Sequence, residues 1–561
     1  MKDRLLRSLK QNILYIIPAL IVWALSFWTD TKIFSSDGLN MNCLPVDTSM
    51  IPFMHISAKI CVLIFWLFMF KFLGYCLRNK RILCVFAFFM LVYGAGLVIT
   101  YPGYYMNDDP IIFAYATRFL PVYWHNYLTS LFYITGMSVF PASCGPVLLS
   151  DVCYALVYTY LFNRGMKGAV GKRGAVSAAI LIICGILPFT LLGALMCFRP
   201  AVYSPFFLLY FLILFFDKKD GKPVSLGRLT GLAFLCGLLS LWRSESIVLL
   251  PLSCILIPLV YANAEKQNNA ISGNFDKNAG ESRKSFGALR LAGAFLLLST
   301  VFYMLLSIPQ KMGENKYYGS DYLIISTTRP LSVIVWRDQT YEGADEDIDN
   351  ISAVTEFGYL HNDSLSCSAY TRYNSDHNEG RYTQTGADEE TQKKYIKSAF
   401  RLILHNLDLY FGERIQLFCV TNGFFGYDRS MVLNLKPIVS TEFHLYDHDK
   451  DYGVEMLNAF LRIPLTYHDD YALFLYKYGG EAFIPVLLLC FILFIISLCR
   501  KDWFLFFVFG TLLAREAVIF LTAPTSFIQY SYPTMYTAAA LAVLLLTQRF
   551  LLPGQGRKGN V

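Results

Sequence analysis

The stretch RNKRILCVFAFFMLVYGAGLVITYPGYYMNDDP, residues 78–110, decides the architecture of this chain. It opens with a basic cluster, continues as an apolar run over residues 82–100 and ends in a polar segment with two adjacent carboxylates, Asp108 and Asp109. A helix needs about 20 apolar residues to cross a bilayer, and Lys and Arg concentrate in cytoplasmic loops. The stretch therefore predicts a membrane-spanning helix that delivers the carboxylate pair to the extracytoplasmic face.

The composition indicates that the whole chain follows this pattern. Its 561 residues are 55% hydrophobic and 16% charged, whereas soluble domains have about 25% charged residues. Residues 309–480 contain 16 Lys and Arg against 25 Asp and Glu, and the rest of the chain contains 32 against 16. Because most of that basic excess lies in short loops, the distribution favours a multi-pass membrane protein. It argues against nucleic acid as a partner, which would need a clustered basic face.

Loop charges predict an all-α polytopic fold with about twelve transmembrane helices and both termini in the cytoplasm. The predicted spans are residues 12–28, 53–77, 82–100, 146–162, 175–197, 201–216, 229–242, 247–261, 291–308, 482–498, 503–521 and 532–547. Spans one to nine belong to residues 1–308, together with a first long loop, 101–145, in which residues 110–140 are expected to form helices at the outer interface. Residues 309–480 form an extracytoplasmic segment, and residues 481–561 contain the last three spans and a cytoplasmic tail.

The extracytoplasmic segment is expected to contain helix, because long loops without secondary structure are uncommon in compact proteins unless they are functional. Residues 390–418 show helical periodicity. The apolar positions on one face are Tyr395, Ala399, Leu402, Leu404, Leu407 and Phe411. This amphipathic stretch is expected to dock on the membrane or on the helical bundle.

Charged residues gather at the predicted outer ends of three spans. Asp108 and Asp109 follow the third span. Arg199 follows the fifth span, and Arg243 and Glu245 follow the seventh. Arginines at span ends often snorkel to the interface without a further role, and this is the alternative for Arg199 and Arg243. Their location beside a carboxylate pair favours a binding site.

The two carboxylates are expected to differ in role. Asp is a good helix cap and Pro is favoured at the first helical position, so Asp109-Pro110 predicts the start of a helix over residues 111–120. Asp109 is therefore expected mainly to cap this helix and secondarily to assist in catalysis. Asp108 has no such structural role and is the predicted chemical group.

Four supporting positions are predicted, namely Glu245, His125, Arg515 and Glu516. Arg515 and Glu516 lie in span eleven, within about two turns of its predicted outer end, and ionisable residues inside a membrane are functional candidates by default. Adjacent helical residues do not face each other, so each needs its own partner. An ion pair inside the bundle is the structural alternative. His125 follows Trp124 in the predicted interfacial helices.

These residue types suit group transfer at a membrane surface. A carboxylate can deprotonate an acceptor hydroxyl, and arginines can hold a phosphate leaving group by charge-assisted, often bidentate, hydrogen bonds. Displacement of phosphate from an anomeric carbon needs a single carboxylate, whereas hydrolysis uses two that flank the bond. The pattern favours glycosyl transfer from a lipid-phosphate-linked sugar.

On these residues the chain resembles the GT-C superfamily of polytopic glycosyltransferases, and within it bacterial members of an uncharacterised subfamily. The motif from Tyr101-Pro102-Gly103 to Asp108 is similar to theirs, as is the turn Ala523-Pro524…Tyr530-Ser531-Tyr532-Pro533 before the last span. Many relatives have Arg where this chain has Gln529. The resemblance is tight over the first motif and loose over the spans from residue 82 onward.

The resemblance implies an inverting reaction, a polyprenyl-phosphate sugar donor and Asp108 as the general base. The expected acceptor is an extracytoplasmic glycan, lipid or protein, and the expected location is a bacterial inner membrane. Only some members of the superfamily use a divalent metal ion, so a metal is left open here, and no other cofactor is expected.

Two other functions remain open at this point. An O-antigen polymerase or ligase also tends to have about twelve spans and a large late periplasmic loop, and its essential groups would be Arg329, Arg372 or His405. A lipid-linked-sugar flippase or transporter would need a polar path through the bundle. Beyond Arg515 and Glu516, the predicted spans contain few charged residues.

Two metal-binding patterns in the acidic segment are weak. The first, third, fifth and twelfth positions of a calcium-loop pattern are Asp345, Asp347, Asp349 and Glu356. Asn350 replaces the glycine of the sharp turn, so a solvated acidic loop is expected instead. His444 and His448 lack the glutamate of a zinc-protease motif.

Overall fold

The computed structural model describes residues 2–35, 45–104, 109–169, 171–271, 280–318, 320–355, 387–422, 483–523 and 530–551. In this part of the chain the secondary structure is helical, apart from an isolated bridge between Tyr104 and Met196. The all-α fold class is therefore confirmed for the described residues.

The helices follow one another along the chain with short connections wherever both neighbours are described. They are α1 (Lys2–Ile33), η1 (Thr48–Met50), α2 (Ile51–Arg78), α3 (Lys80–Ile99), α4 (Asp109–Ala116), η2 (Tyr123–His125), α5 (Tyr127–Val139), α6 (Gly145–Gly165), α7 (Gly171–Ile186), α8 (Pro188–Ala194), α9 (Arg199–Asp220), α10 (Leu226–Trp242), η3 (Ser244–Val248), α11 (Leu249–Ile271), α12 (Gly280–Tyr317), α13 (Asp321–Ile334), α14 (Ala344–Ser352), α16 (Glu389–His405), α17 (Leu407–Thr421), α21 (Phe483–Cys499), α22 (Trp503–Thr522), α23 (Tyr532–Leu546) and η7 (Thr547–Leu551).

Eight helices in the described residues are long and apolar enough to cross a membrane, and α7 with α8 makes a ninth if the pair is one span bent by 50°. The break falls at Pro188, which lacks a backbone N–H to continue the helix. The apolar helices α10 and α21 have only 17 residues each. The lengths and compositions of these helices are those of a multi-pass membrane protein, but the predicted number of twelve spans is not confirmed.

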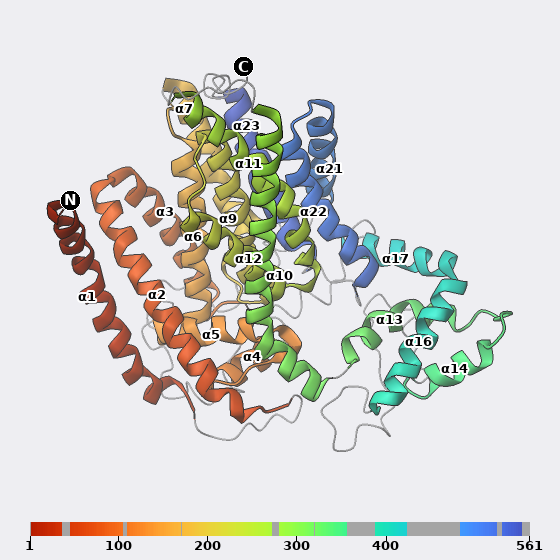
Figure 1. Ribbon diagram of the computed structural model, residues 1–561. Coiled ribbons are helices and arrows are strands. Elements are labelled where there is room, and N and C mark those ends of the chain that lie inside the picture. The colour runs from red at the N-terminus through yellow and green to blue at the C-terminus, as the bar shows by residue number, and fades with distance from the viewer. Residues whose placement is uncertain are drawn as a thin grey trace.

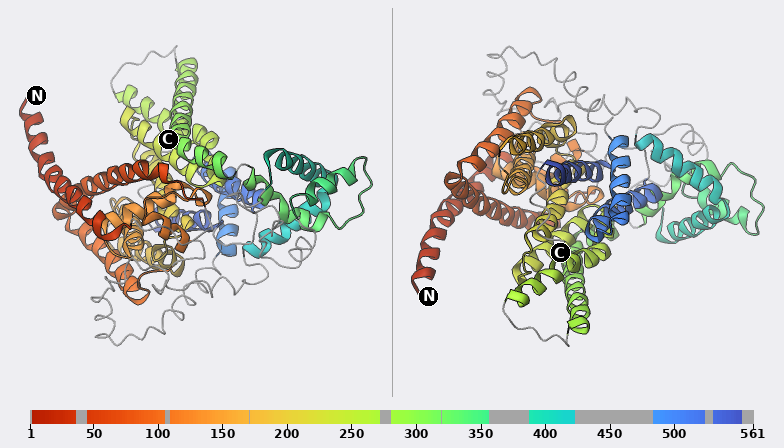
Figure 2. Two further views of the ribbon diagram at one scale, coloured as in Figure 1. Left: turned by 90° about the horizontal axis from the view of Figure 1, so that it is seen from below. Right: turned by 90° about the horizontal axis from the view of Figure 1, so that it is seen from above.

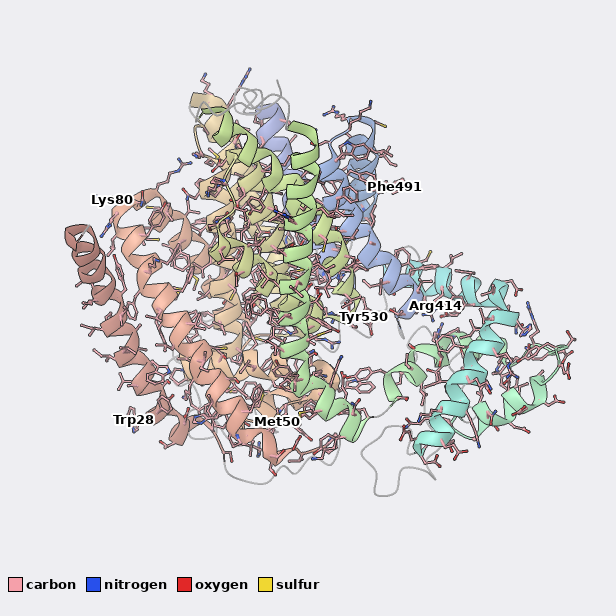
Figure 3. The ribbon with its side chains drawn as sticks, in the orientation of Figure 1. Trp28, Met50, Lys80, Arg414, Phe491 and Tyr530 are labelled. Carbon is pink, nitrogen blue, oxygen red and sulfur yellow. The ribbon has the colours of Figure 1, made fainter. Side chains whose placement is uncertain are left out.

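The long helices stand side by side in one bundle, with α1 and α2 along one flank (Figure 1). Lys80 lies toward one end of the bundle, and Trp28 and Met50 lie toward the other (Figure 3). The short helices α4 and α5 cross beneath the long ones at the end near Met50, here called the α5 end. The start of α1 and the end of α23 both point toward the Lys80 end, which agrees with the predicted alternation of spans.

The helices expected at the outer interface, α4, η2 and α5, form at the α5 end but are more enclosed than predicted. Every residue of α5 except Leu131 is buried, and α5 packs against α2, α4 and α6. The helix begun at Asp109-Pro110 ends at Ala116 and not at residue 120, because the chain turns at Phe119, whose φ is +55°.

The outer helices expose large apolar side chains, as a lipid-facing surface requires. On α2 these include Ile56, Ile60 and Ile64, each more than half exposed. On α12 they include Leu297, Met304 and Leu305. Aliphatic side chains of this size have no reason to face water in such numbers, so these faces fit contact with lipid tails.

The helices α13, α14, α16 and α17 form a second, smaller group beside the α5 end (Figure 2). Their own apolar core is made by Ile324, Leu331, Ile334, Ile351, Val354, Ala387, Tyr395, Ala399, Leu402 and Ile403. The predicted helix over residues 390–418 is broken at Asn406, which ends α16. The predicted apolar face is buried only as far as Leu402, because Leu404, Leu407 and Phe411 are 67%, 44% and 45% exposed.

The acidic stretch that matched a calcium-loop pattern is not a loop. Asp345, Asp347 and Asp349 belong to the helix α14, which begins after Gly343, whose φ is +86°. On a helix Asp345 and Asp349 share one face and Asp347 points away from it, and the Asp347 carboxylate accepts a hydrogen bond of 2.8 Å from the Tyr341 hydroxyl. Both the calcium pattern and the expected solvated loop are therefore wrong for residues 345–349, and Glu356 lies outside the described residues.

Candidate functional site

Charged residues from four helices meet in a buried cluster near the α5 end. Arg199 is the first residue of α9, and Arg243 is the corner between α10 and η3, which contains Glu245. Arg515 and Glu516 lie in the C-terminal half of α22. We call these five residues the arginine cluster. All five were predicted as site residues, and the fold brings them together.

Glu245 is the centre of the arginine cluster. Its Oε1 accepts hydrogen bonds from Arg243 Nε at 2.6 Å and from Arg515 Nη2 at 2.8 Å. The side chains of Arg243, Arg515 and Glu245 are 1%, 0% and 9% exposed. Ion pairs with so little water cannot be snorkelling residues, so the interface alternative is wrong for Arg243.

Arg515 is held by several further partners. Its Nε donates to Ser246 Oγ at 3.2 Å, and its Nη1 donates to the Tyr530 carbonyl at 2.8 Å and to Thr534 Oγ1 at 3.0 Å. Ser246 in turn accepts from the Tyr203 hydroxyl at 2.8 Å. This network fixes the Arg515 guanidinium between η3 and the start of α23.

Glu516 has its own partner, as expected for a residue adjacent to Arg515 on a helix. The Ser531 hydroxyl donates to Glu516 Oε2 at 2.6 Å, and Arg515 Nη1 lies 3.4 Å from Glu516 Oε1. The turn Tyr530-Ser531-Tyr532 therefore borders the arginine cluster. Gln529 lies outside the described residues.

Arg243 keeps unused hydrogen-bonding capacity. Its Nη1 is buried and has no hydrogen-bond partner in the described part of the chain, and its guanidinium lies 5.7 Å from the centre of the Tyr530 ring. Arg199, half-buried, interacts electrostatically with both Arg243 and Glu245. Three guanidinium groups thus face two carboxylates, and a buried excess of positive charge favours a bound anion.

The described residues nearest to Asp108, Tyr104 and Asp109, both interact with the segment that leads to Arg199. Asp108 itself lies outside the described residues. The Tyr104 amide donates to the Leu195 carbonyl at 2.9 Å, and Asp109, 2% exposed, interacts electrostatically with Cys197. A helix begins at Asp109-Pro110 as predicted, but Asp109 is itself the first residue of α4 and does not precede the helix as the predicted cap.

The turn containing His125 is tied to the segment just before Arg243. His125 is buried in η2. The next residue, Asn126, donates from its side chain to the Leu241 carbonyl at 3.0 Å, and the Trp242 indole donates to Thr129 Oγ1 at 3.0 Å. The turn that contains His125 thus lies against the segment just before Arg243, and the supporting role of His125 stays a prediction.

Several buried polar residues, some of them in the site and others elsewhere in the bundle, were missed by sequence reasoning. Ser246 and Thr534 carried no signal, because isolated hydroxyl residues are common in spans. Asp151 and Lys59 could have been identified from the sequence, since each is an ionisable residue inside a predicted span. Asp151 is fully buried, and neither carboxylate oxygen has a hydrogen-bond partner among the described residues. The predicted spans therefore contain more charged residues than expected.

Of the three residues of the polymerase or ligase alternative, the structure describes Arg329 and His405. Arg329 is 2% exposed and pairs with Glu413 at 2.9 Å. His405 is exposed and stacks on Tyr341 at 4.0 Å. Arg372, His444 and His448 lie outside the described residues. Arg329 thus forms a buried ion pair with Glu413.

The use of a divalent metal ion, which the resemblance leaves open, is not tested by the described residues. Within the residues that the structure describes, no group of three or more His, Cys, Asp or Glu side chains could hold a metal ion. Asp108 is not among the residues searched, so the donor set beside Asp109 is incomplete.

Comparisons with family models, with curated proteins and with solved structures found no match to this chain.

Arg515→Met is expected to lower the free energy of unfolding by about 3–5 kcal/mol, because it leaves Glu245 and Glu516 buried with fewer compensating charges. Thermal and denaturant unfolding of the purified variants would measure this. Arg337→Met is the matched control, because Arg337 pairs with Asp408 at an exposed position and should cost at most about 1 kcal/mol. Equal destabilisation by the two substitutions would contradict the buried network.

Proposed function

We propose that this chain is an integral-membrane glycosyltransferase that moves a sugar from a polyprenyl-phosphate donor to an extracytoplasmic acceptor. The observation that carries the proposal is the arginine cluster, with three arginines against two glutamates and a buried Arg243 Nη1 that has no hydrogen-bond partner among the described residues. A phosphate monoester or diester supplies the negative charge and the acceptor oxygens that this arrangement lacks.

The position of the cluster suits a lipid-linked donor. Its arginines lie at or near helix ends in a bundle whose outer helices expose apolar side chains. A polyprenyl tail can remain among lipids while its phosphate reaches Arg199 and Arg243. In the proposed complex the sugar lies toward the α5 end, where Tyr104 and Asp109 interact with the segment before Arg199.

In the proposed reaction Asp108 accepts the proton of an acceptor hydroxyl as that oxygen attacks the anomeric carbon. The new carbon–oxygen bond forms as the bond from the anomeric carbon to the phosphate oxygen breaks. The phosphate leaves with the electron pair of that bond, and Arg199 and Arg243 stabilise the negative charge it gains. Attack from the opposite face inverts the anomeric configuration.

The direct test is the release of polyprenyl phosphate. The purified protein in lipid nanodiscs is incubated with a panel of undecaprenyl-phosphate hexoses and pentoses and with membranes that supply acceptors, and undecaprenyl phosphate is quantified by mass spectrometry. Release above that of the heat-treated protein is expected for at least one donor. Absence of release and of donor binding across the panel would contradict the proposal.

The proposal also requires the α5 end to face the extracytoplasmic side. A cysteine introduced at Thr340 is expected to react with an impermeant maleimide in intact cells, and a cysteine introduced at Lys80 only after permeabilisation, because both positions are exposed and Lys80 belongs to a basic loop. The parent protein is labelled in parallel to subtract its own cysteines. The reverse labelling pattern would place the site in the cytoplasm and exclude the proposed reaction.

A further inference from the structure

We propose that Trp124 and Tyr322 form a platform for the sugar ring of the donor. This inference rests on the proposed function and adds to it the residues that recognise the sugar. In a polyprenyl-phosphate sugar the ring is bonded directly to the phosphate. A side chain that recognises the ring must therefore lie beside the arginines that bind the phosphate.

The two rings come from distant parts of the chain and are held in one orientation. Trp124 belongs to η2 and Tyr322 to the first turn of α13. Their ring centroids are 4.6 Å apart and their planes differ by 16°. The Tyr322 hydroxyl donates to the Tyr123 carbonyl at 3.0 Å, and Tyr318 packs against Trp124 at 5.4 Å.

The pair is accessible and adjoins the arginine cluster. Tyr322 is 37% exposed and Trp124 is half-buried, whereas Tyr318 beneath them is 1% exposed. Tyr322 also interacts electrostatically with Arg199. The segment after Trp124 also contacts the segment before Arg243, because Asn126 donates from its side chain to the Leu241 carbonyl at 3.0 Å.

This combination matches the chemistry of a glycosyl phosphate. A pyranose ring presents C–H groups on its faces, which pack on aromatic rings, and hydroxyl groups at its edge, which need polar partners. A phosphate needs cations and hydrogen-bond donors. The Trp124–Tyr322 pair provides the first surface and Arg199 belongs to the second, so one ligand that joins a sugar ring to a phosphate can use both.

Aromatic residues also concentrate where helices leave a membrane, without binding any ligand. Trp28 provides the matched control for that role, because it lies at the same end of the bundle (Figure 3) and is 67% exposed. Loss of Trp28 removes an interface aromatic and leaves the Trp124–Tyr322 pair intact.

The experiment compares the affinity of each variant for undecaprenyl phosphate and for undecaprenyl-phosphate sugars in nanodiscs by native mass spectrometry. The wild type is expected to bind at least one sugar-bearing lipid more tightly than undecaprenyl phosphate. Tyr322→Ala is expected to reduce this preference about threefold to tenfold and to leave the affinity for undecaprenyl phosphate unchanged. Tyr322→Phe and Trp28→Ala are expected to keep the preference.

Each other outcome overturns the inference in a recognisable way. An unchanged preference in Tyr322→Ala, or an equal loss in Trp28→Ala, would contradict the platform while the proposed function stands. Failure of the wild type to bind undecaprenyl phosphate at all would contradict the proposed function together with the platform. If Tyr322→Ala does not accumulate, Tyr322→Leu, which keeps an apolar side chain without the ring, is measured against the same expectations.

Discussion

Asp108→Asn is expected to abolish sugar transfer while the protein still inserts and accumulates normally. The amide has nearly the same shape as the carboxylate but cannot accept the proton of the attacking hydroxyl. General base catalysis contributes about 10²–10⁴-fold to rate, so kcat should fall by a factor in this range. Release of undecaprenyl phosphate measures the activity, and immunoblotting of membranes measures accumulation.

Asp109→Asn is the matched control for this substitution. Asp109 lies in the first turn of α4, where a negative charge typically contributes only about 0.3–1 kcal/mol to a helix, so this variant should keep the helix and most of the activity. Full activity in Asp108→Asn would contradict the assignment of Asp108 as the general base. A larger loss in Asp109→Asn than in Asp108→Asn would move the base to Asp109.

Arg243→Gln is expected to lower kcat/KM for the donor by about 10²–10³-fold. Removal of one preorganised donor from a site where negative charge develops typically has an effect of this size. The effect should appear in both kcat and KM, because the phosphate is bound in the ground state and gains charge as it leaves. Steady-state kinetics with an undecaprenyl-phosphate sugar would resolve the two constants.

Arg414→Gln separates a functional effect from a loss of stability. Arg414 is as buried as Arg243, pairs with Glu413, and donates to the Ala523 carbonyl at 2.6 Å, at the C-terminal end of α22. Its loss should destabilise the protein and leave the KM for the donor unchanged. If Arg414→Gln raised KM as much as Arg243→Gln, the phosphate-binding role of Arg243 would be refuted.

The candidate site was largely visible in the sequence because its residues break a strong local pattern. Charges are rare in long apolar runs and costly in a bilayer, so Arg515 and Glu516 stood out without any structure. Arg199, Arg243 and Glu245 stood out because they follow apolar runs on the same predicted side. The same criterion should have identified Asp151 in the fourth predicted span and Lys59 in the second.

The sequence could not show how these charges pair. Glu245 and Arg515 are separated by 270 positions along the chain, yet lie 2.8 Å apart. Their contact depends on how η3 packs against α22 and on where α23 begins. The lack of a hydrogen-bond partner for Arg243 Nη1 among the described residues is likewise a result of packing, because no acceptor from these residues lies within hydrogen-bond distance of it.

The sequence by itself determined that this chain is helical, that it carries many apolar segments and that charged residues cluster at their ends. Those properties are local, since apolar length and helical periodicity act within each segment. Only the tertiary structure decided that α5 is enclosed, that the helix after residue 390 breaks at Asn406, and that Arg243, Glu245 and Arg515 form one buried network. These features depend on which segments pack together, and the sequence of one segment does not specify which other segments it will contact.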